Sequence, residues 1–597
     1  MQEKVSQFKT DPITIEVIKN FLVTTCREMG IAMMHASYSP MFNEALDFSC
    51  VIFDSKPEMI AQAEFCPAQI GAIRHTVKWC IKEVNPQNLN DGDVVLTNDP
   101  YRGGCHLPEF LVVKPCFYNG EIIAYTANIA HMTDVGGMAP ACFGTQQNIF
   151  QEGLRLPPVK IYINDKENED IFKTVCSNVR TPKNSYGDLK AMIGSLYLAE
   201  QRIKELVEKY GIDVFRQATE DIKNVSERKM REEISKMPDG EWESDGFLED
   251  DGVVPDKMYK IKVRIILRGD EIIVDYTGSS RQALGPPNQT FGVTASATYN
   301  AIFHLLGTEI DFNEGCYRPI TIIAPPGSFV NVNYPGACVG GNSDTHPTTV
   351  NTLMYAFSKI LPERISAMDG GTCGCIAIGG VHPDTEEPFA HLHLDGVGWG
   401  GRVDHDGNDS VFVKNGNCGN TPVEVYESRY PVLIEEYMLQ EGSAGAGKYR
   451  GGYGTRRKVK FLADTIVSAH TNYHVLKPQG VFWGKAASNA QLKFRCGDST
   501  EFRTSKEQFN AISLGKFINL TLHSGDELVW ISPGGGGYGD SLERDPTLVL
   551  KDFIEERITL REVREDYGVV IDPEKRAVNM EKTTELRRRM RDAHQRG

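Results

Sequence analysis

Apolar positions in the first part of the chain switch between the spacing of helices and the spacing of strands. They predict a helix within 11–36, a strand over 47–53, a helix over 68–84 and a strand over 93–97. Two apolar, β-rich runs then flank Asn119-Gly120. Because both residues of that dipeptide tolerate positive φ, we expect a β-hairpin with strands over 110–118 and 121–130.

The pattern after residue 188 alternates between long helices and short strands. Residues 189–237 are expected to form two helices, broken near Gly211, that pair as a hairpin. A β-hairpin turned by Gly269-Asp270 follows, and the chain from 285 to 540 is rich in glycine. The further expected elements are helices over 295–306 and 348–359, strands within 455–532 and helices within 546–595.

These patterns predict an α+β, multi-domain protein with a β-rich, glycine-rich centre and helical segments at the N-terminus, in the middle and at the C-terminus. The length of 597 residues suits two to four compact units. We expect an N-terminal α+β domain that carries the first hairpin (1–188), a helical hairpin with a β-hairpin (189–284), a glycine-rich, β-rich domain (285–540) and a helical tail (541–597).

Composition and charge narrow the class of protein. The net charge of −16, with no large basic block, argues against a nucleic-acid partner and against an anionic membrane. No apolar run is long enough for a membrane span, and the polar N-terminus does not resemble a signal peptide. The 14 cysteines lack paired CxxC spacing, so we expect buried thiols in a reducing compartment rather than a zinc ribbon. A cytoplasmic enzyme subunit fits these features.

The predicted turn also fixes a register for the first hairpin. With Asn119-Gly120 at the tip, Tyr118 pairs with Glu121, and counting back puts Pro108 opposite His131. His106 then lies diagonally across from His131, about 7–8 Å away at the backbone.

Two histidines and two carboxylates therefore gather at the open end of the hairpin. Glu109 and Asp134 lie at the two strand ends, close to His106 and His131. Imidazole and carboxylate ligands suit a divalent metal such as Zn, Mn or Fe. An ordinary surface or core role for the histidines is the alternative, and strict strand alternation would turn Glu109 away from His106.

A basic loop in the glycine-rich region is a second candidate site. It concentrates cations on permissive backbone between residues 445 and 457. Lys448, Arg450 and Arg456 are candidates for binding a carboxylate or a phosphate, and a basic surface loop is the alternative.

Two other motifs allow both a functional and a structural interpretation. His391, His393 and Asp395 alternate and would share one face of a strand, either as a second metal or acid/base cluster or as core residues. The run 533–540 lacks the features of a nucleotide-binding loop, so we expect it to serve tight packing.

Several motifs occur in one order along nearly the whole chain. They are Asn43-Glu44, Asp47-Phe48-Ser49, Asn98 to Pro108, His131 with Asp134 to Gly137, Gln151 to Pro158, Asn420 to Glu424, Gly447 to Gly452 and Pro533 to Asp540. In these motifs the chain resembles the hydantoinase B/5-oxoprolinase C-terminal-half family, which includes the larger subunits of acetone and acetophenone carboxylases.

The resemblance implies a subunit that does not work alone. In the family, a hydantoinase A-like subunit with an actin-type ATPase fold binds ATP and Mg and phosphorylates a carbonyl or carboxylate. We therefore expect such an ATPase partner, with further small subunits as additional candidates, and a divalent metal, Zn or Mn, on this chain. The residues that match the family's metal site are His106, Glu109 and His131, with Glu44 or Asp47 as a further carboxylate.

The resemblance also yields catalytic candidates and three candidate functions. The motif carboxylates Asp99, Asp134 and Glu152 are the expected catalytic residues. The favoured function is ATP-dependent, biotin-independent carboxylation of an acetone- or acetophenone-like ketone with bicarbonate. The first alternative is ATP-dependent opening of a cyclic amide such as a hydantoin or a lactam. The second is a non-catalytic scaffold for the ATPase subunit, against which the intact metal motif counts.

The preference for carboxylation depends on residues beside the metal motif. Glu109 stands where the family usually has Asp. A carboxylase must keep water from an activated CO₂ equivalent, and Met132, Met138, Phe143 and Phe150 offer apolar side chains for a dry site. A plain core role for these four residues is the alternative.

Overall fold

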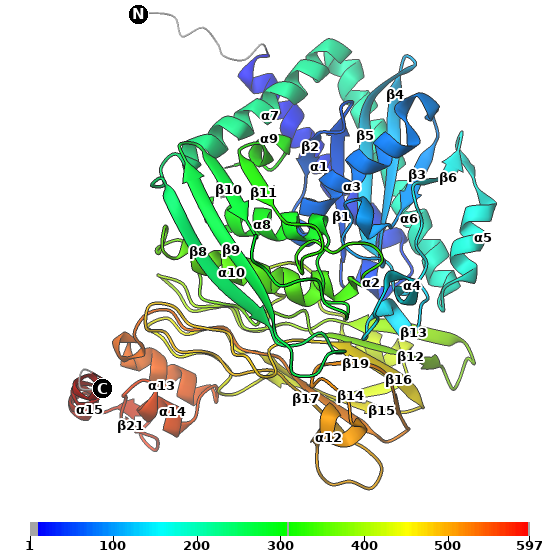
Figure 1. Cartoon of the computed structure of the whole chain (residues 1–597). Helices are drawn as coiled ribbons and strands as arrows, with labels where there is room; N and C mark the ends of the chain where they lie inside the picture. The colour runs from blue at the N-terminus through cyan, green and yellow to red at the C-terminus, as the bar shows by residue number, and fades with distance from the viewer. Residues whose placement is uncertain (1–9, 307–309, 595–597) are drawn as a thin grey trace, which may run out of the picture.

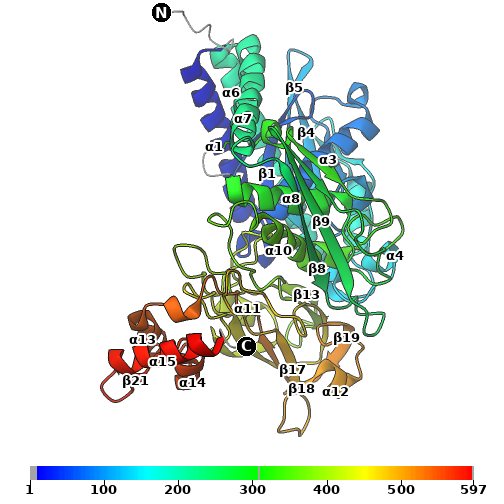
Figure 2. The same cartoon turned by 60° about the vertical axis from the view of Figure 1, so that its left-hand side comes forward.

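The computed structural model describes residues 10–306 and 310–594 (Figures 1 and 2). Its N-terminal part is built on a seven-stranded antiparallel sheet of order β2-β1-β5-β4-β3-β6-β7. The strands are β1 (Phe48–Asp54), β2 (Met59–Gln62), β3 (Val94–Thr97), β4 (Glu109–Tyr118), β5 (Glu121–His131), β6 (Val159–Ile163) and β7 (Lys166–Glu167). Every residue of β1 and β3 is buried, so both faces of the sheet are covered.

Long helices cover the two faces of this sheet. Helices α1 (Pro12–Ala36) and α6 (Pro182–Tyr210) pack together on one face, and α3 (Pro67–Val84) covers the other. Helix α1 starts where the sequence predicts, because the Asp11 side chain accepts a hydrogen bond from the Thr14 amide and Pro12 occupies the first turn. The short helices of this part are α2 (Pro40–Asn43), α4 (Ile149–Glu152) and α5 (Glu169–Ser177).

A second sheet, of order β11-β10-β9-β8, shares a core with the first through helices that lie between them (Figure 1). Helix α8 packs against α3 and α10, and α10 packs on β8 and β9. The elements are β8 (Gly240–Leu248), β9 (Tyr259–Arg268), β10 (Glu271–Asp275), β11 (Ile320–Ile323), α7 (Ile212–Ile234), α8 (Phe291–Leu306), α9 (Glu314–Tyr317) and α10 (His346–Phe357).

The lower part of the molecule in Figure 1 is a β-sandwich with its own core. One sheet has the order β13-β12-β16-β19 and the other β14-β15-β20-β17-β18. The strands are β12 (Cys375–Val381), β13 (Pro388–His393), β14 (Val432–Leu439), β15 (Thr455–Phe461), β16 (Thr465–His470), β17 (Gln491–Arg495), β18 (Arg503–Thr504), β19 (Lys516–Leu522) and β20 (Glu527–Ile531), with helices α11 (Val423–Arg429) and α12 (Ser505–Phe509).

Glycine-rich loops pack directly against one another beside the sandwich. The Gly445 amide donates to the Gly535 carbonyl at 2.8 Å, and the Gly401 amide donates to the Gly536 carbonyl at 2.9 Å. A Cβ on Gly535 would lie 1.9 Å from the Trp399 carbonyl oxygen, so no larger residue fits there. The predicted packing role of 533–540 is confirmed.

The C-terminal tail is helical, as predicted. It contains α13 (Pro546–Ile554), α14 (Leu560–Glu565), α15 (Met580–His594) and a small hairpin of β21 (Ile571–Asp572) and β22 (Ala577–Val578). Across the described residues, no helix has the length and apolar character needed to cross a membrane.

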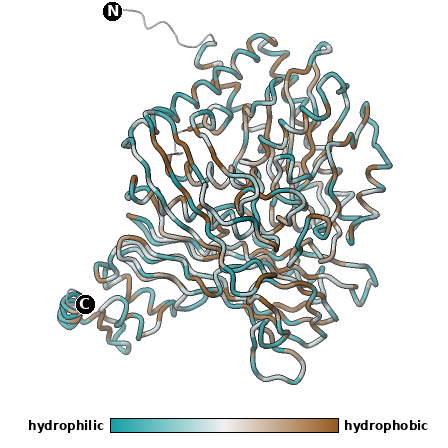
Figure 3. Tube along the Cα trace, in the orientation of Figure 1, coloured by the Kyte–Doolittle hydropathy of each residue, from teal (hydrophilic) through white to brown (hydrophobic). Residues whose placement is uncertain are grey.

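The α+β class is confirmed, and hydrophobic and hydrophilic stretches alternate along the chain trace (Figure 3). Two details differ from the expected organisation. Helices α6 and α7 meet at Gly211, but α6 packs mainly on α1 and α7 on α9. Elements α8, β11 and α10 lie beyond residue 285, yet they join the N-terminal layers. Strand β11 pairs in parallel with β10, α8 packs against α3, and α10 packs on β8 and β9.

Candidate metal centre

The first hairpin forms at the predicted turn, but its register shifts along the strands. Tyr118 pairs with Glu121 as predicted, and an irregularity between Cys116 and Phe117 then moves the pairing by one residue. His131 therefore faces Glu109 and not Pro108, so the predicted pairing at this end was wrong. The shift places the Glu109 carboxylate beside the histidines.

Three side chains that can bind a metal converge at the open end of this hairpin. His106, Glu109 and His131 each offer one ligand atom, and these atoms all lie within 4.8 Å of one another. Nε2 of His106 is 3.5 Å from Oε1 of Glu109, and the two imidazole centroids are 5.1 Å apart. The Phe143 ring packs against both imidazoles, with centroid distances of 6.0 and 6.1 Å. All three polar residues are buried.

The atoms that would bind the metal make no hydrogen bonds. Nε2 of His106, Nε2 of His131 and Oε2 of Glu109 are buried and have no partner among the described residues. Burying a polar atom without a hydrogen-bond partner costs free energy of folding. Three such atoms that face one another therefore indicate a binding site for a ligand. Two imidazoles and one carboxylate suit Zn, Mn or Fe, and the cluster therefore fits a divalent transition-metal ion.

Asp47 is a further polar group beside the cluster. Its backbone carbonyl accepts a hydrogen bond from the His131 amide at 3.0 Å, and its Oδ2 lies 3.8 Å from Nδ1 of His131. Gln69 Nε2 donates to Oδ1 of Asp47 at 2.8 Å and fixes the carboxylate. Glu44, the other carboxylate considered, lies at the end of α2 and is not part of the group of converging ligand atoms in the described chain.

A segment far along the chain orients two of the candidate ligands. Nδ1 of His106 lies 2.8 Å from the Val339 carbonyl oxygen, which leaves Nε2 as the free ligand atom. Asn342 Nδ2 donates to Oε1 of Glu109 at 3.1 Å. Asn342 belongs to a π-helical turn, Gly341–Thr345, a rare conformation that occurs often at functional sites.

Glu152 holds that segment in place. Its Oε1 accepts hydrogen bonds from the Cys338 amide at 2.6 Å and from the Val339 amide at 2.8 Å. Burial raises the pKa of Glu152 to about 7, although both amides oppose this shift. Glu152 was expected as a catalytic residue, and the structure places it behind Val339, where it supports the carbonyl that orients His106.

Burial and neighbouring charges control protonation in the cluster. Burial, followed by repulsion from Glu109, raises the pKa of Asp47 to about 7. Burial and the nearby His106 lower the pKa of His131 well below its usual range. For His106, burial lowers the pKa, but Glu109, the hydrogen bond with the Val339 backbone and Asp47 together more than offset this effect, and the net shift is upward.

Asp134, another expected catalytic residue, serves the loop after β5. Its carboxylate accepts hydrogen bonds from the backbone amides of Gly136, Ala141 and Arg180, at 2.7 to 3.2 Å. The Arg180 guanidinium also pairs with it at 3.0 Å. Its acceptor positions are therefore used in holding the loop.

Asp99 has a comparable local role. Its Oδ1 accepts from the Tyr101 amide at 3.0 Å, which caps the short helix Pro100–Arg102, and its Oδ2 pairs with Arg102. The neighbouring Asn98 ties together the loops of the motif, because its side chain bonds to the backbone of Leu107, Leu154 and Leu156.

The cations of the basic loop are largely engaged within the protein. Arg450 is buried and pairs with Asp409 at 3.0 Å, and Arg456 pairs with Glu436 at 2.6 Å. Lys448 lies at the surface, 3.8 Å from the Glu543 carboxylate. All three expected anion ligands thus have carboxylate partners, which removes the geometric support for an anion site here.

His391, His393 and Asp395 do lie together at the end of β13. Arg457, however, sits among them, 2.8 Å from Nδ1 of His393 and 3.2 Å from Oδ1 of Asp395. A guanidinium in this position disfavours a second cation. Burial lowers the pKa of His391 to about 3, and its ring stacks on Tyr430 at 4.7 Å, as expected for a core residue.

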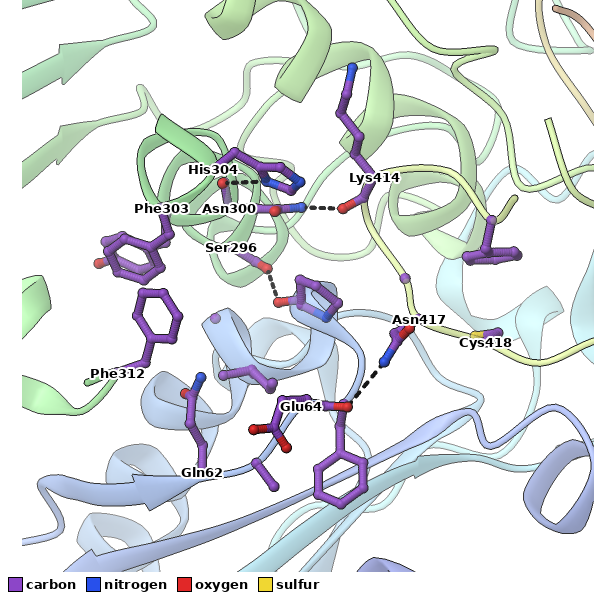
Figure 4. Close-up of a pocket in the computed structure, with 18 of the residues that line it drawn as sticks. Gln62, Glu64, Ser296, Asn300, Phe303, His304, Phe312, Lys414, Asn417 and Cys418 are labelled. Carbon is purple, nitrogen blue, oxygen red and sulfur yellow. Dashed lines mark hydrogen bonds between the residues drawn. The ribbon is translucent and has the colours of Figure 1, made fainter. Parts of the chain in front are cut away.

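A cavity of about 1060 Å³ is lined by residues of α8, of the chain at the end of β2 and of the segment between residues 414 and 420 (Figure 4). Phe303 of α8 and Phe312 stand on one side of it, and Asn417 and Cys418 stand on another. Cys418 lines the cavity and is one of the groups that moderate the upward shift in the pKa of Asp47.

A match to one protein family covers most of the chain, including the candidate metal ligands His106, Glu109 and His131. The family model for hydantoinase B/oxoprolinase matches residues 11–541. The chain belongs to the hydantoinase B/oxoprolinase family. This membership confirms the resemblance inferred from the motifs.

Three relatives align over almost their whole length with this family member. An uncharacterized protein of Methanocaldococcus jannaschii is 37% identical, over 97% of this chain and 100% of the relative. The B component of a candidate D-/L-hydantoinase of Pseudomonas sp. (strain NS671) is 32% identical, over 97% and 98% of the two chains. The beta chain of the caprolactamase of Pseudomonas jessenii is 31% identical, over 94% and 96%. Two of these relatives are named as parts of larger enzymes.

Two solved structures share the fold. The ATP-dependent caprolactamase from Pseudomonas jessenii superposes with a TM-score of 0.87 at 28% identity, over 97% of this chain and 100% of that chain. A nucleotide-free acetone carboxylase superposes with a TM-score of 0.89 at 19% identity, over 98% of this chain and 83% of the other. At 19% identity the likeness to the carboxylase shows the fold alone.

Sequence reasoning alone missed the residues that orient the ligands. Val339 and Asn342 lie more than 200 residues from the hairpin, and Gln69 lies on α3. The Gly340-Gly341-Asn342 run belongs to the glycine-rich region of the sequence, but no local pattern relates it to His106 or Glu109.

Proposed function

We propose that this chain is the metal-binding subunit of an ATP-dependent enzyme that opens a cyclic amide together with an ATPase subunit. The observation that carries the proposal is the buried cluster of His106, Glu109 and His131, whose ligand atoms have no partners among the described residues. Two relatives above 30% identity are named for a hydantoinase and a caprolactamase, which supports a cyclic amide as substrate.

The structural support for ketone carboxylation is weaker than the sequence suggested. Of the four apolar residues considered for a dry site, Met132 and Phe143 are buried, and only Phe143 packs on both histidines. Met138 and Phe150 are exposed on the surface, so they do not enclose the cluster. Carboxylation of a ketone with bicarbonate is the alternative function. The assay described below distinguishes it from the opening of a cyclic amide.

The residues of the cluster and their neighbours have distinct roles in the proposed reaction. His106, Glu109 and His131 would hold the metal, with Asp47 beside them, and a divalent ion supplies Lewis-acid chemistry to such a site. The Val339 carbonyl and the Asn342 amide fix the orientation of His106 and Glu109. Phe143 shields one side of both imidazoles from water. The ATPase partner activates the amide by phosphorylating its oxygen, which makes the amide carbon electrophilic.

This division of labour predicts that the isolated chain does not turn over ATP, because its sequence carries no Walker motif and no actin-type phosphate loops. The test is to reconstitute the chain with its ATPase partner and to supply ATP, labelled bicarbonate, a panel of lactams and hydantoins and a panel of ketones. We expect ATP-dependent ring opening without incorporation of label. Label fixed into a 3-oxo acid, with no ring opening, would reject the proposal in favour of a carboxylase.

A further inference from the structure

The π-helical turn Gly341–Thr345 connects a candidate metal ligand to the β-sandwich. From this turn, Asn342 Nδ2 donates to Oε1 of Glu109 at 3.1 Å. Two residues further on, Oδ2 of Asp344 lies 2.6 Å from Nδ1 of His470, the last residue of strand β16 in the sandwich (Figure 1). One short turn therefore gives one side chain to the candidate metal site and another to the sandwich.

Asp344 and His470 form an isolated buried pair. Both residues are 0% exposed, and Oδ2 of Asp344 and Nδ1 of His470 have no other hydrogen-bond partner among the described residues. A separation of 2.6 Å between two such atoms requires a proton between them, so each atom depends on the other. A buried pair of this kind adds little net stability, because its desolvation offsets the gain from the contact. The pair therefore points to a role in fixing one conformation of the turn.

Two further side chains hold the turn in the same position. Thr372 Oγ1 donates to Oδ1 of Asp344 at 2.7 Å, and Asn415 Nδ2 donates to the backbone carbonyl of Asn342 at 2.7 Å. All four of these residues are buried. A π-helical turn is rare because it is not the preferred conformation of a free chain, so it depends on tertiary contacts such as these.

His470 also packs against the segment that orients His106. A Cβ on Gly340 would lie 2.2 Å from Cε1 of His470, so the imidazole lies directly on the Gly340 backbone. The preceding Val339 carbonyl contacts Nδ1 of His106. Nε2 of His470 is buried without a partner among the described residues, so stability alone would favour an apolar side chain at this position. The polar contact that the imidazole provides is the one with Asp344.

We propose that Asp344 and His470 are positioning residues for the candidate metal ligands: through the π-helical turn they hold Asn342 against the Glu109 carboxylate. This inference rests on the proposed function, because it takes the cluster at the end of the hairpin as the metal site. It adds to that function two residues that lie far along the chain from the hairpin. Loss of a contact that orients a metal ligand usually weakens metal binding about 10–100-fold, and the pair acts on such a contact.

Cobalt(II) titration of the purified, metal-free, full-length chain tests the inference without ATP or a partner subunit. Cobalt(II) is the probe because its visible absorption reports the geometry of its ligands. His470→Leu fills the space on Gly340 but loses the contact with Asp344, so we expect about tenfold weaker binding and an altered spectrum. In His470→Asn the amide nitrogen takes the place of Nδ1, and this variant should retain most of the affinity and the wild-type spectrum. His391→Leu removes another buried imidazole of the sandwich and is the matched control, with binding as in wild type.

A double-mutant cycle tests whether the pair acts through Asn342. Asn342→Ala alone should weaken cobalt(II) binding about tenfold or more. Adding His470→Leu to it should change the affinity by less than about twofold, because both substitutions remove the same contact with Glu109. Circular dichroism and thermal unfolding check that each variant is folded during the titration. If His470→Leu does not fold, Thr372→Val removes the other contact with the Asp344 carboxylate and enters the same cycle.

The outcomes separate this inference from the proposed function. Wild-type affinity and spectrum in folded His470→Leu, or effects of His470→Leu and Asn342→Ala that multiply in the double variant, would overturn the inference and leave the proposed function intact. A wild-type chain that binds no cobalt(II) would overturn both. Weaker binding in His470→Leu, recovery in His470→Asn and no further loss in the double variant are the results that the inference predicts.

Discussion

Nδ1 of His106 lies 2.8 Å from the carbonyl oxygen of Val339, a residue 233 positions further along the chain. The contact sets the ring orientation of one candidate ligand from a segment that Glu152 holds through two backbone amides. The candidate metal ligands thus depend on a support that no local sequence pattern contains.

Replacement of Glu152 should test that support. Glu152→Ala leaves the amides of Cys338 and Val339 buried without an acceptor, which should cost about 1–3 kcal/mol of stability. It should also weaken metal binding about 10–100-fold, as loss of an orienting contact usually does. Calorimetric unfolding and metal titration of the folded variant measure the two effects. Glu152→Gln, which keeps an acceptor oxygen, should retain most of the affinity, and equal metal affinity in Glu152→Ala and wild type would contradict this role.

Asp134 should behave as a structural residue. Asp134→Ala removes the acceptor of three backbone amides and the partner of Arg180, so we expect a loss of about 1–3 kcal/mol in the free energy of unfolding. The folded variant should keep its metal and most of its kcat. Denaturant unfolding gives the first quantity and assay of the reconstituted complex the second. A stable Asp134→Ala protein with abolished turnover would instead identify Asp134 as a catalytic residue.

The acid sensitivity of the N-terminal layers should depend on Glu314. This buried carboxylate pairs with Arg74 and Lys78 of α3; burial alone would raise its pKa, but the two cations lower it to about 2. Because the folded pKa lies below the unfolded value of about 4.3, the pair stabilises the fold above that pH, and this contribution is lost as the pH falls toward 2.

We therefore expect Glu314→Gln to lose about 3 kcal/mol at neutral pH and to flatten the pH dependence of unfolding between about pH 4.5 and 2. Glu64→Gln removes an exposed carboxylate from Arg27 and serves as the control, with little expected effect. Thermal unfolding followed across this pH range compares the three proteins. Parallel curves for wild type and Glu314→Gln would refute the assignment.

Local chemistry accounts for the parts of the fold that the sequence could predict. The Asn119-Gly120 turn and the Asp11 cap act over a few residues, so the hairpin and helix α1 follow from them directly. The register near His131 could not be predicted, because the irregularity at Cys116 and Phe117 leaves no signal in the hydrophobic alternation.

Of the candidate site, only the metal ligands could be predicted from the sequence. His106, Glu109 and His131 are close in sequence or joined by one hairpin, whereas Asn342 reaches them only through tertiary packing. The basic loop shows the opposite case. Its cations stand out in the sequence, but the aspartate that pairs with Arg450 lies on a distant loop, and the pairing could not be foreseen.

The central claim is that His106 and His131 hold a divalent metal with Glu109. The most direct measurement is the elemental metal content of the purified wild-type chain and of the variants His106→Ala, His131→Ala and His405→Ala, the last being an exposed control beside Asp404. We expect about one transition-metal ion per chain in wild type and in His405→Ala. Both cluster variants should be folded by circular dichroism and should lose most of the metal. Unchanged metal stoichiometry in folded His106→Ala and His131→Ala would contradict the account.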